Sequence, residues 1–203
     1  MSNYITKEDI IIFSPEWNSP LNIKLLSNYK KLIFSDYELN DNLFEKYENN
    51  YFSNSNCIYS KFNQEVNKLP KSITHLTFGY QFNQEVNNLP NSLTHLTFGK
   101  EFNQKIDIPF TIKYLKLNCN NSYIIDYLPD NIDELELGYD FNLELNNLPT
   151  SIKKITFDKY SKYNKKLNCL PKFLECLLLP ENYDKKLLNI SNNLKIICSN
   201  AYK

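Results

Sequence analysis

The sequence predicts a mainly β solenoid of the leucine-rich-repeat kind, right-handed, with a curved parallel sheet and about 20 residues per rung. Three observations predict this fold. The first is a near-exact tandem copy in the middle of the chain. The second is the recurrence of the same spacing in weaker copies on either side. The third is the alternation of apolar and polar residues at the end of each copy.

The tandem copy covers residues 62–99. Residues 62–79 read FNQEVNKLPKSITHLTFG, and residues 82–99 read FNQEVNNLPNSLTHLTFG. The two copies differ only at Lys68/Asn88, Lys71/Asn91 and Ile73/Leu93. A copy of this length in tandem is the signature of a repeat array.

Each unit is conveniently numbered from its proline, Pro70 or Pro90 in the two best copies. Apolar residues follow at plus three, plus six and plus eight, and the closing Leu-x-Phe has the period of a short strand with one buried face. One such unit cannot bury its own apolar residues, whereas stacked units form a continuous core. Roughly nine rungs at about 4.8 Å would span ~40 Å.

The segments between strands are expected to be loops or short 3-10 turns on the convex side, because a proline precedes each strand and disfavours a long helix there. An asparagine follows the phenylalanine of most units, and stacked asparagines can bond from rung to rung. The fourth unit lacks its phenylalanine but keeps Pro129 and the apolar residues around it.

The whole chain, residues 1–203, is predicted to be a single solenoid domain. Residues 62–181 hold the clear repeats, 1–61 degenerate N-terminal rungs or a cap, and 182–203 a C-terminal capping rung with Ile197 at plus six and polar Ser199 at plus eight. Ile11 and Phe13, and then Leu32 and Phe34, fit two N-terminal strands. Two readings stay open for residues 35–61, of which one takes Ile58 as the strand residue. The other is one stretched rung built from Tyr37, Leu39, Leu43, Tyr47 and Phe52.

The unit FNQEVNNLPNSLTHLTFG resembles the FNIP repeat, a leucine-rich-repeat variant found in slime moulds and in giant viruses of amoebae. The resemblance covers Phe62 to about Ile197. Proteins of this family often carry an F-box or another domain ahead of the repeats, so the resemblance implies a role in presenting partners, sometimes to ubiquitin ligases. The first 60 residues of this chain have no F-box pattern and are more similar to eroded repeats.

Composition argues against several functions. Acidic and basic residues balance at 23 each, and every basic residue is lysine, so neither nucleic acid nor an anionic membrane is expected as a partner. The five cysteines have irregular spacing without a C-x-x-C, which favours a reducing, cytoplasmic location. The N-terminal residues match neither a signal peptide nor a membrane span.

The partner-binding site is predicted on the exposed side of the strands, at plus five and plus seven, since function in a repeat protein lies on such variable positions. The predicted residues are His75, Thr77, His95, Thr97, Tyr114, Lys116, Glu134, Glu136, Lys154 and Thr156.

No catalytic or metal-binding residue is assigned. His75 and His95 should be neighbours, but two ligands do not make a zinc site, and the second histidine arose with the duplication. Glu134 and Glu136 are flanked by lysines on adjacent rungs, so cross-strand charge pairing explains them better than acid–base catalysis. Cys176 lies about four rungs from His95, too far for a cysteine–histidine couple.

The predicted function is therefore a non-enzymatic, monomeric scaffold without a cofactor that binds a protein partner, which would be a host protein if the chain came from a virus. Two alternatives remain. One is a structural or self-associating repeat protein. The other is the substrate-recognition part of a ubiquitin-ligase adaptor that lacks its own F-box.

Overall fold

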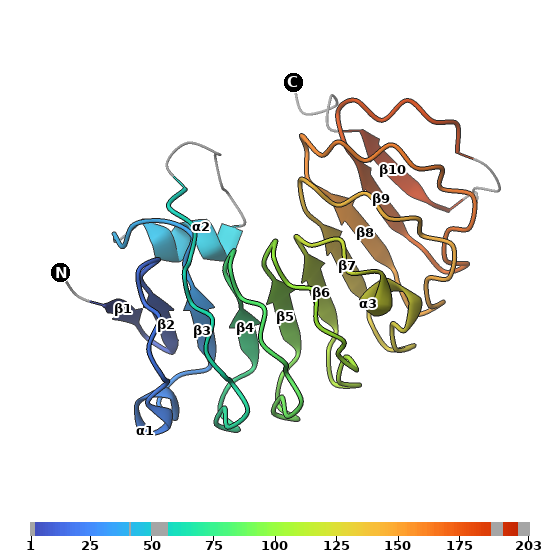
Figure 1. Ribbon diagram of the computed structural model, residues 1–203. Coiled ribbons are helices and arrows are strands. Elements are labelled where there is room, and N and C mark those ends of the chain that lie inside the picture. Colours follow the sequence, from blue (N-terminus) through green and yellow to red (C-terminus); the bar gives the residue numbers. More distant parts are fainter. Residues whose placement is uncertain (1–2, 41, 50–56, 188–192, 199–203) are drawn as a thin grey trace.

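The computed structural model describes residues 3–40, 42–49, 57–187 and 193–198, and their strands form one curved sheet (Figure 1). The ten strands follow one another in chain order; β1 and β2 are antiparallel, and every later pair is parallel. The strands are β1 Tyr4–Lys7, β2 Ile10–Phe13, β3 Lys31–Phe34, β4 His75–Thr77, β5 His95–Phe98, β6 Tyr114–Leu117, β7 Glu134–Leu137, β8 Lys154–Phe157, β9 Cys176–Leu179 and β10 Lys195–Cys198. The helices are α1 Ile23–Leu26, α2 Leu43–Asn49 and α3 Ser122–Asp126.

The parallel strands are aligned position for position, which confirms the predicted repeat unit. Leu76 lies opposite Leu96, and Leu96 opposite Leu115. The strands β5 to β9 alternate half-buried and buried residues, with plus six and plus eight buried. These residues, together with the phenylalanines of the units, form the main core.

Phenylalanine rings form the centre of that core. Phe62, Phe82 and Phe102 stack with centroids 6.0 Å apart, and Phe78 and Phe98 insert their rings at 3.7 and 3.9 Å from Phe82 and Phe102. Their side chains are essentially inaccessible to solvent. The phenylalanine positions are thus packing positions, as the repeat spacing indicated.

Asparagines connect the rungs along the edge of the stack. The Oδ1 atom of Asn63 accepts the backbone N–H of Asn83 at 2.9 Å, and Asn83 accepts that of Asn103 in the same way. The ladder stops in the unit without a phenylalanine and resumes at Asn142, whose N–H bonds Asn120 Oδ1. Each of these bonds satisfies a backbone N–H group where the chain bends, and stabilises the fold by about 1 kcal/mol.

In the described residues, the connections between strands are mostly turns and loops, with the three short helices α1, α2 and α3. In five units the proline carbonyl accepts the N–H of the plus-three residue, so the proline opens a turn that leads into the strand, as in Pro70–Ile73 and Pro90–Leu93. The short helices α1 and α3 are α-helical and not 3-10. Helix α3 lies in the unit that lacks phenylalanine, where Ile124 and Ile125 supply the buried side chains.

The N-terminal rungs lie where the sequence placed them, but neither reading of residues 35–61 is right. Strand β3 pairs directly with β4, so no strand intervenes, and Ile58 is 39% exposed. The segment is an insertion containing α2, and Phe52 lies outside the described residues. The sequence analysis also missed β1, which forms a hairpin with β2 through Glu8 and Asp9; Glu8 has a φ of 52° without being glycine.

The register of the last strand corrects one further expectation. Ile196, not Ile197, lies opposite the buried Leu177, and Ile197 lies opposite Leu178 on the other face. The plus-six residue of this rung is therefore Ile196. Ser199 lies outside the described residues.

Candidate functional site

The two predicted ladders run in register across one face of the sheet, which we call the open face. In the plus-five ladder, His75 lies opposite His95, and the pairing continues through Tyr114, Glu134 and Lys154. The plus-seven ladder runs in parallel through Thr77, Thr97, Lys116, Glu136 and Thr156. All ten side chains are half-buried. The alternation of the strands places them opposite the core, while their role in binding stays a prediction.

The charges of β6 to β8 are paired with one another. Lys116 Nζ lies 2.6 Å from Glu136 Oε1, and the Tyr114 hydroxyl donates to Glu136 Oε2. Lys154 Nζ lies 3.1 Å from Glu134 Oε2. The predicted cross-strand charge pairing is therefore present. Each glutamate has a cationic partner, which is an arrangement for holding neighbouring strands together.

The two histidines stack face to face. Their ring centroids are 3.9 Å apart at an interplanar angle of 15°, and His95 stacks in turn on Tyr114. The Thr94 hydroxyl donates to the Thr74 carbonyl, so it accepts its bond with His95 Nδ1 from the ring N–H. That tautomer leaves a lone pair on Nε2.

Neither histidine is disposed to charge or to bind a metal alone. Burial, followed by the charges of His95 and Lys31, lowers the pKa of His75 to about 4. Burial also lowers the pKa of His95, against a smaller opposite effect of Glu134. Stacked rings direct their lone pairs along parallel lines and not towards one point. Over the described parts of the chain, no three potential metal ligands come together.

The insertion between β3 and β4 forms a wall at the N-terminal end of the open face. Leu43 and Phe44 of α2 pack on Ile10, Ile12 and Ile33, making a second apolar cluster on this face. In the same segment, the Tyr47 hydroxyl donates to Ser35 Oγ, 3.2 Å away. Helix α2 thus covers β2 and β3 and leaves the following strands bare.

A half-buried carboxylate ties the two ends of the insertion to the stack. Asp36 Oδ1 accepts the backbone N–H groups of Ser60 at 2.7 Å and Tyr80 at 2.8 Å. Burial raises the pKa of Asp36, against the lowering effect of these two bonds. One side chain therefore fixes the position of the backbone where the insertion ends and the repeats begin.

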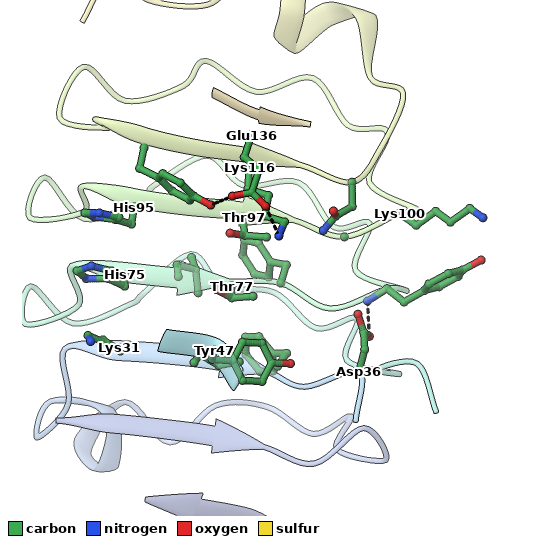
Figure 2. A pocket seen from close by; sticks show the side chains of 18 of the residues that line it. Lys31, Asp36, Tyr47, His75, Thr77, His95, Thr97, Lys100, Lys116 and Glu136 are labelled. Carbon is green, nitrogen blue, oxygen red and sulfur yellow. Dashed lines mark hydrogen bonds and ion pairs between the residues drawn. The ribbon is translucent and has the colours of Figure 1, made fainter. Parts of the chain in front are cut away.

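Between this wall and the ladders lies a broad groove of about 1120 Å³. Figure 2 shows Lys31, His75 and His95 in one column, and Thr77 and Thr97 in the next, with Tyr47 below the threonines. The wall contributes Tyr37, Phe44, Tyr47, Cys57 and Tyr59.

Sequence reasoning missed the groove because it treated the insertion as a rung. Two signals could have found it. Leu43, Phe44 and Tyr47 have helical spacing. Ile10, Ile12 and Ile33 occupy ladder positions that are polar in the middle rungs, which indicates that something covers them.

In the part of the chain that the structure describes, the ladder cysteine lies far from the two histidines. Cys176, the ladder cysteine, lies on β9, four strands from His95 on β5. No helix within the described ranges has the length and apolar character to cross a membrane.

Comparisons with known proteins identify the repeats. The family model for the FNIP repeat matches residues 62–100, 85–120 and 120–160. A comparison with curated protein sequences gave no match. One matching solved structure is described as that of CroV588, a novel circular LRR protein; it is 23% identical, with a TM-score of 0.42 over 97% of this chain. The chain spans 41% of that protein's length. Residues 62–160 of this chain therefore consist of FNIP repeats.

Proposed function

We propose that this FNIP-repeat protein is a non-enzymatic scaffold that binds a protein partner on its open face, in the groove that runs from α2 across strands β3 to β7. The observation that carries the proposal is the pair of in-register polar ladders beside a wall built by an insertion. An insertion that closes one end of a face gives it a defined shape, and a solenoid face with variable side chains is a binding surface.

The chemistry of the face supports binding over catalysis. Glu134 and Glu136 are held by lysines, whereas a general base needs a carboxylate free to accept a proton. The groove is also open and long, in contrast to the enclosed cavity of a small-molecule site. Such a surface suits an extended segment or a convex part of another protein.

The test is an affinity capture from an amoebal lysate with two baits. One is the wild-type chain, and the other carries alanine at His95, Tyr114 and Glu134. These side chains are half-buried and outside the core, so the variant should melt within a few degrees of wild type. A protein retained by wild type and lost from the variant supports the proposal. Equal retention would show that the open face is not the binding surface.

The alternatives separate in the same experiment. Ubiquitin-ligase subunits among the captured proteins would assign a substrate-recognition role. The observation behind the self-association alternative is that β1 and β10 each have only one neighbour in the described sheet, so their free edges offer a place where two copies of the chain could pair. We expect a monomer, and light scattering over a concentration series would reveal assembly.

We also propose that the protein works in a reducing intracellular compartment. The described cysteines Cys57, Cys119, Cys169 and Cys176 are free thiols, which supports this location. Fractionation of cells that express the tagged chain would test it.

A further inference from the structure

The charges on the open face are distributed unevenly. On β6 to β8, Lys116 and Lys154 each have a glutamate partner. On β3 to β5, Lys31, His75 and His95 lie opposite one another in register, and we call these three side chains the basic column. Within the described residues, none of the three forms an ion pair with a carboxylate. The basic column is therefore the part of the face whose capacity to bind an anion is unused.

The column lies at the foot of the wall, inside the groove. Lys31 follows Ile10 along the same ladder, and Ile10 is covered by α2. Figure 2 shows the three side chains one above the other with their nitrogen atoms towards the same side. An occupant seated against the wall would meet all three.

Burial lowers the pKa of both histidines and so favours their uncharged rings. Thr74 and Thr94 bond the Nδ1 atoms, which leaves each Nε2 to take up a proton. The charged and titratable groups that face the rings are Lys31 and Asp9 on the N-terminal side, and Tyr114 and Glu134 on the C-terminal side. Tyr47 of α2 also lines the groove. A carboxylate at Nε2 would stabilise the protonated ring, which offsets the burial that lowers the pKa of both histidines and the repulsion from His95 that lowers the pKa of His75 further.

We propose that the basic column is the docking point for an acidic, extended segment of the partner protein, whose carboxylates pair with Lys31 and draw protons from solvent onto His75 and His95. The inference rests on the proposed function and names the chemistry of the partner. Adjacent rungs are about 4.8 Å apart, so the column spans about 10 Å. Alternate side chains of an extended peptide are about 7 Å apart, so two acidic residues reach across the three basic groups.

The experiment is isothermal titration calorimetry of the full chain with an acetylated and amidated peptide in which glutamate alternates with alanine. The control peptide has glutamine in place of glutamate. The glutamate peptide should bind more tightly, with an affinity that rises about fivefold from pH 7.5 to pH 5.5 because proton uptake accompanies binding. Equal binding of the two peptides, or no binding of either, would overturn the inference.

Three variants locate the binding. Lys31→Met should lower the affinity for the glutamate peptide about fivefold at both pH values. Lys71→Met is the matched control, since Lys71 is exposed and lies outside the groove, and it should change nothing. His75→Gln with His95→Gln should abolish the pH dependence while Lys31 continues to contribute. Equal affinities for the two lysine variants would place the peptide elsewhere and overturn the proposal.

Two further results distinguish this inference from non-specific anion binding and from the proposed scaffold function. If inorganic phosphate displaces the peptide at equal concentration, the column takes any anion and the peptide assignment is wrong. If Lys31→Met captures as much of a partner as wild type does, while the His95/Tyr114/Glu134 variant loses it, the scaffold function stands and the acidic-segment inference fails.

Discussion

The open face divides into two regions with the same backbone and different side chains. On β2 and β3, ladder residues such as Ile10, Ile12 and Ile33 are apolar and buried beneath α2. On β4 to β8 the same positions hold histidine, threonine, tyrosine, lysine and glutamate, all half-buried. The rung geometry does not set these identities, because it is the same in both regions. In these two regions the identities differ with the cover above the rung.

The difference gives a way to interpret a ladder position. An apolar residue at plus five or plus seven costs free energy when it faces water, so a run of them indicates a covering element. Cys176 and Leu178 on β9 are the contrasting case, since they are half-buried on the same face without a covering helix among the described residues. The comparison can be tested by changing the cover, the covered residues and the bare ones in turn.

The largest effect is expected from the cover itself. Leu43 of α2 is fully buried in the second cluster, so Leu43→Ala should lower the free energy of unfolding by about 3 kcal/mol. The loss should be local, because this cluster is separate from the main core. Urea denaturation with amide hydrogen exchange would measure both quantities.

Ile58→Ala is the matched control for that change. Ile58 belongs to the same insertion and is 39% exposed, so its truncation should cost less than about 1 kcal/mol. If Leu43→Ala costs no more than the control, α2 does not hold the cover in place. Loss of protection in β4 to β8 would show that the wall and the repeats unfold as one unit.

The second prediction compares a covered and a bare residue at the same ladder position. Ile12 on β2 is 0% exposed, so Ile12→Thr buries a hydroxyl and should cost about 2 kcal/mol. Leu178→Thr on β9 should cost less than about 0.5 kcal/mol, since threonine suits a half-exposed strand position. Thermal or urea unfolding of both variants would measure the difference. Equal costs would mean that β9 is also covered.

The repeat region was predictable because each unit restates the same constraints. The alternation of Leu96 and Phe98 with His95 and Thr97 defined the strand, its buried face and its neighbours. Once the period was known, counting residues from the proline of each unit gave the register of the ladders. Even the Asn63–Asn83 bond could be expected from an asparagine at a fixed place in the turn.

The insertion and the chain ends could not be derived from the period. Residues 35–61 contain apolar residues at several spacings, and only tertiary contact decides that Leu43 and Phe44 pack on the open face. The β1–β2 hairpin lacks the glycine or asparagine that usually marks such turns. In the last rung, Ile196 and Ile197 are chemically alike, so the sequence could not fix which one faces the core. The groove depends on the insertion and was therefore missed, whereas the ladder residues were placed correctly.

The third prediction concerns the carboxylate that holds the wall. Asp36→Ala removes the acceptor of two backbone N–H groups and should cost about 2 kcal/mol. Asp36→Asn keeps the acceptor oxygen and should stay within about 1 kcal/mol of wild type, because the raised pKa of Asp36 shows that burial disfavours its charge.

Urea denaturation at pH 7 would measure these costs. Asp158→Ala is the control, since Asp158 accepts the N–H of Tyr160 at an exposed turn, and its loss should cost about 0.5 kcal/mol. If asparagine is as damaging as alanine at position 36, the charge itself holds the wall, and the burial argument for this carboxylate is wrong.

The smallest effect should come from acid on the bare region. The pKa of His75 in the folded chain, about 4, lies below the ordinary value of 6.5, so the unfolded chain binds more protons between these two values. The contribution of His75 to the free energy of unfolding is therefore fully present above pH 6.5 and is lost as the pH falls towards 4. Because His75 is only about half-buried, solvent screening reduces the loss between pH 7 and pH 5 to about 1 kcal/mol.

The contribution of the histidines is isolated by comparison with the His75→Gln, His95→Gln variant. The pKa of Asp36 is raised, so its contribution to stability changes with pH in the opposite direction, but it is the same in both proteins and cancels in the comparison. Wild type should lose about 1 kcal/mol more than the variant from pH 7 to pH 5. Excess glutamate peptide should reverse this difference, since it binds the protonated column of the folded chain. If the two proteins lose stability equally, the bare region is not strained by protonation, and its contrast with the covered region is one of packing alone.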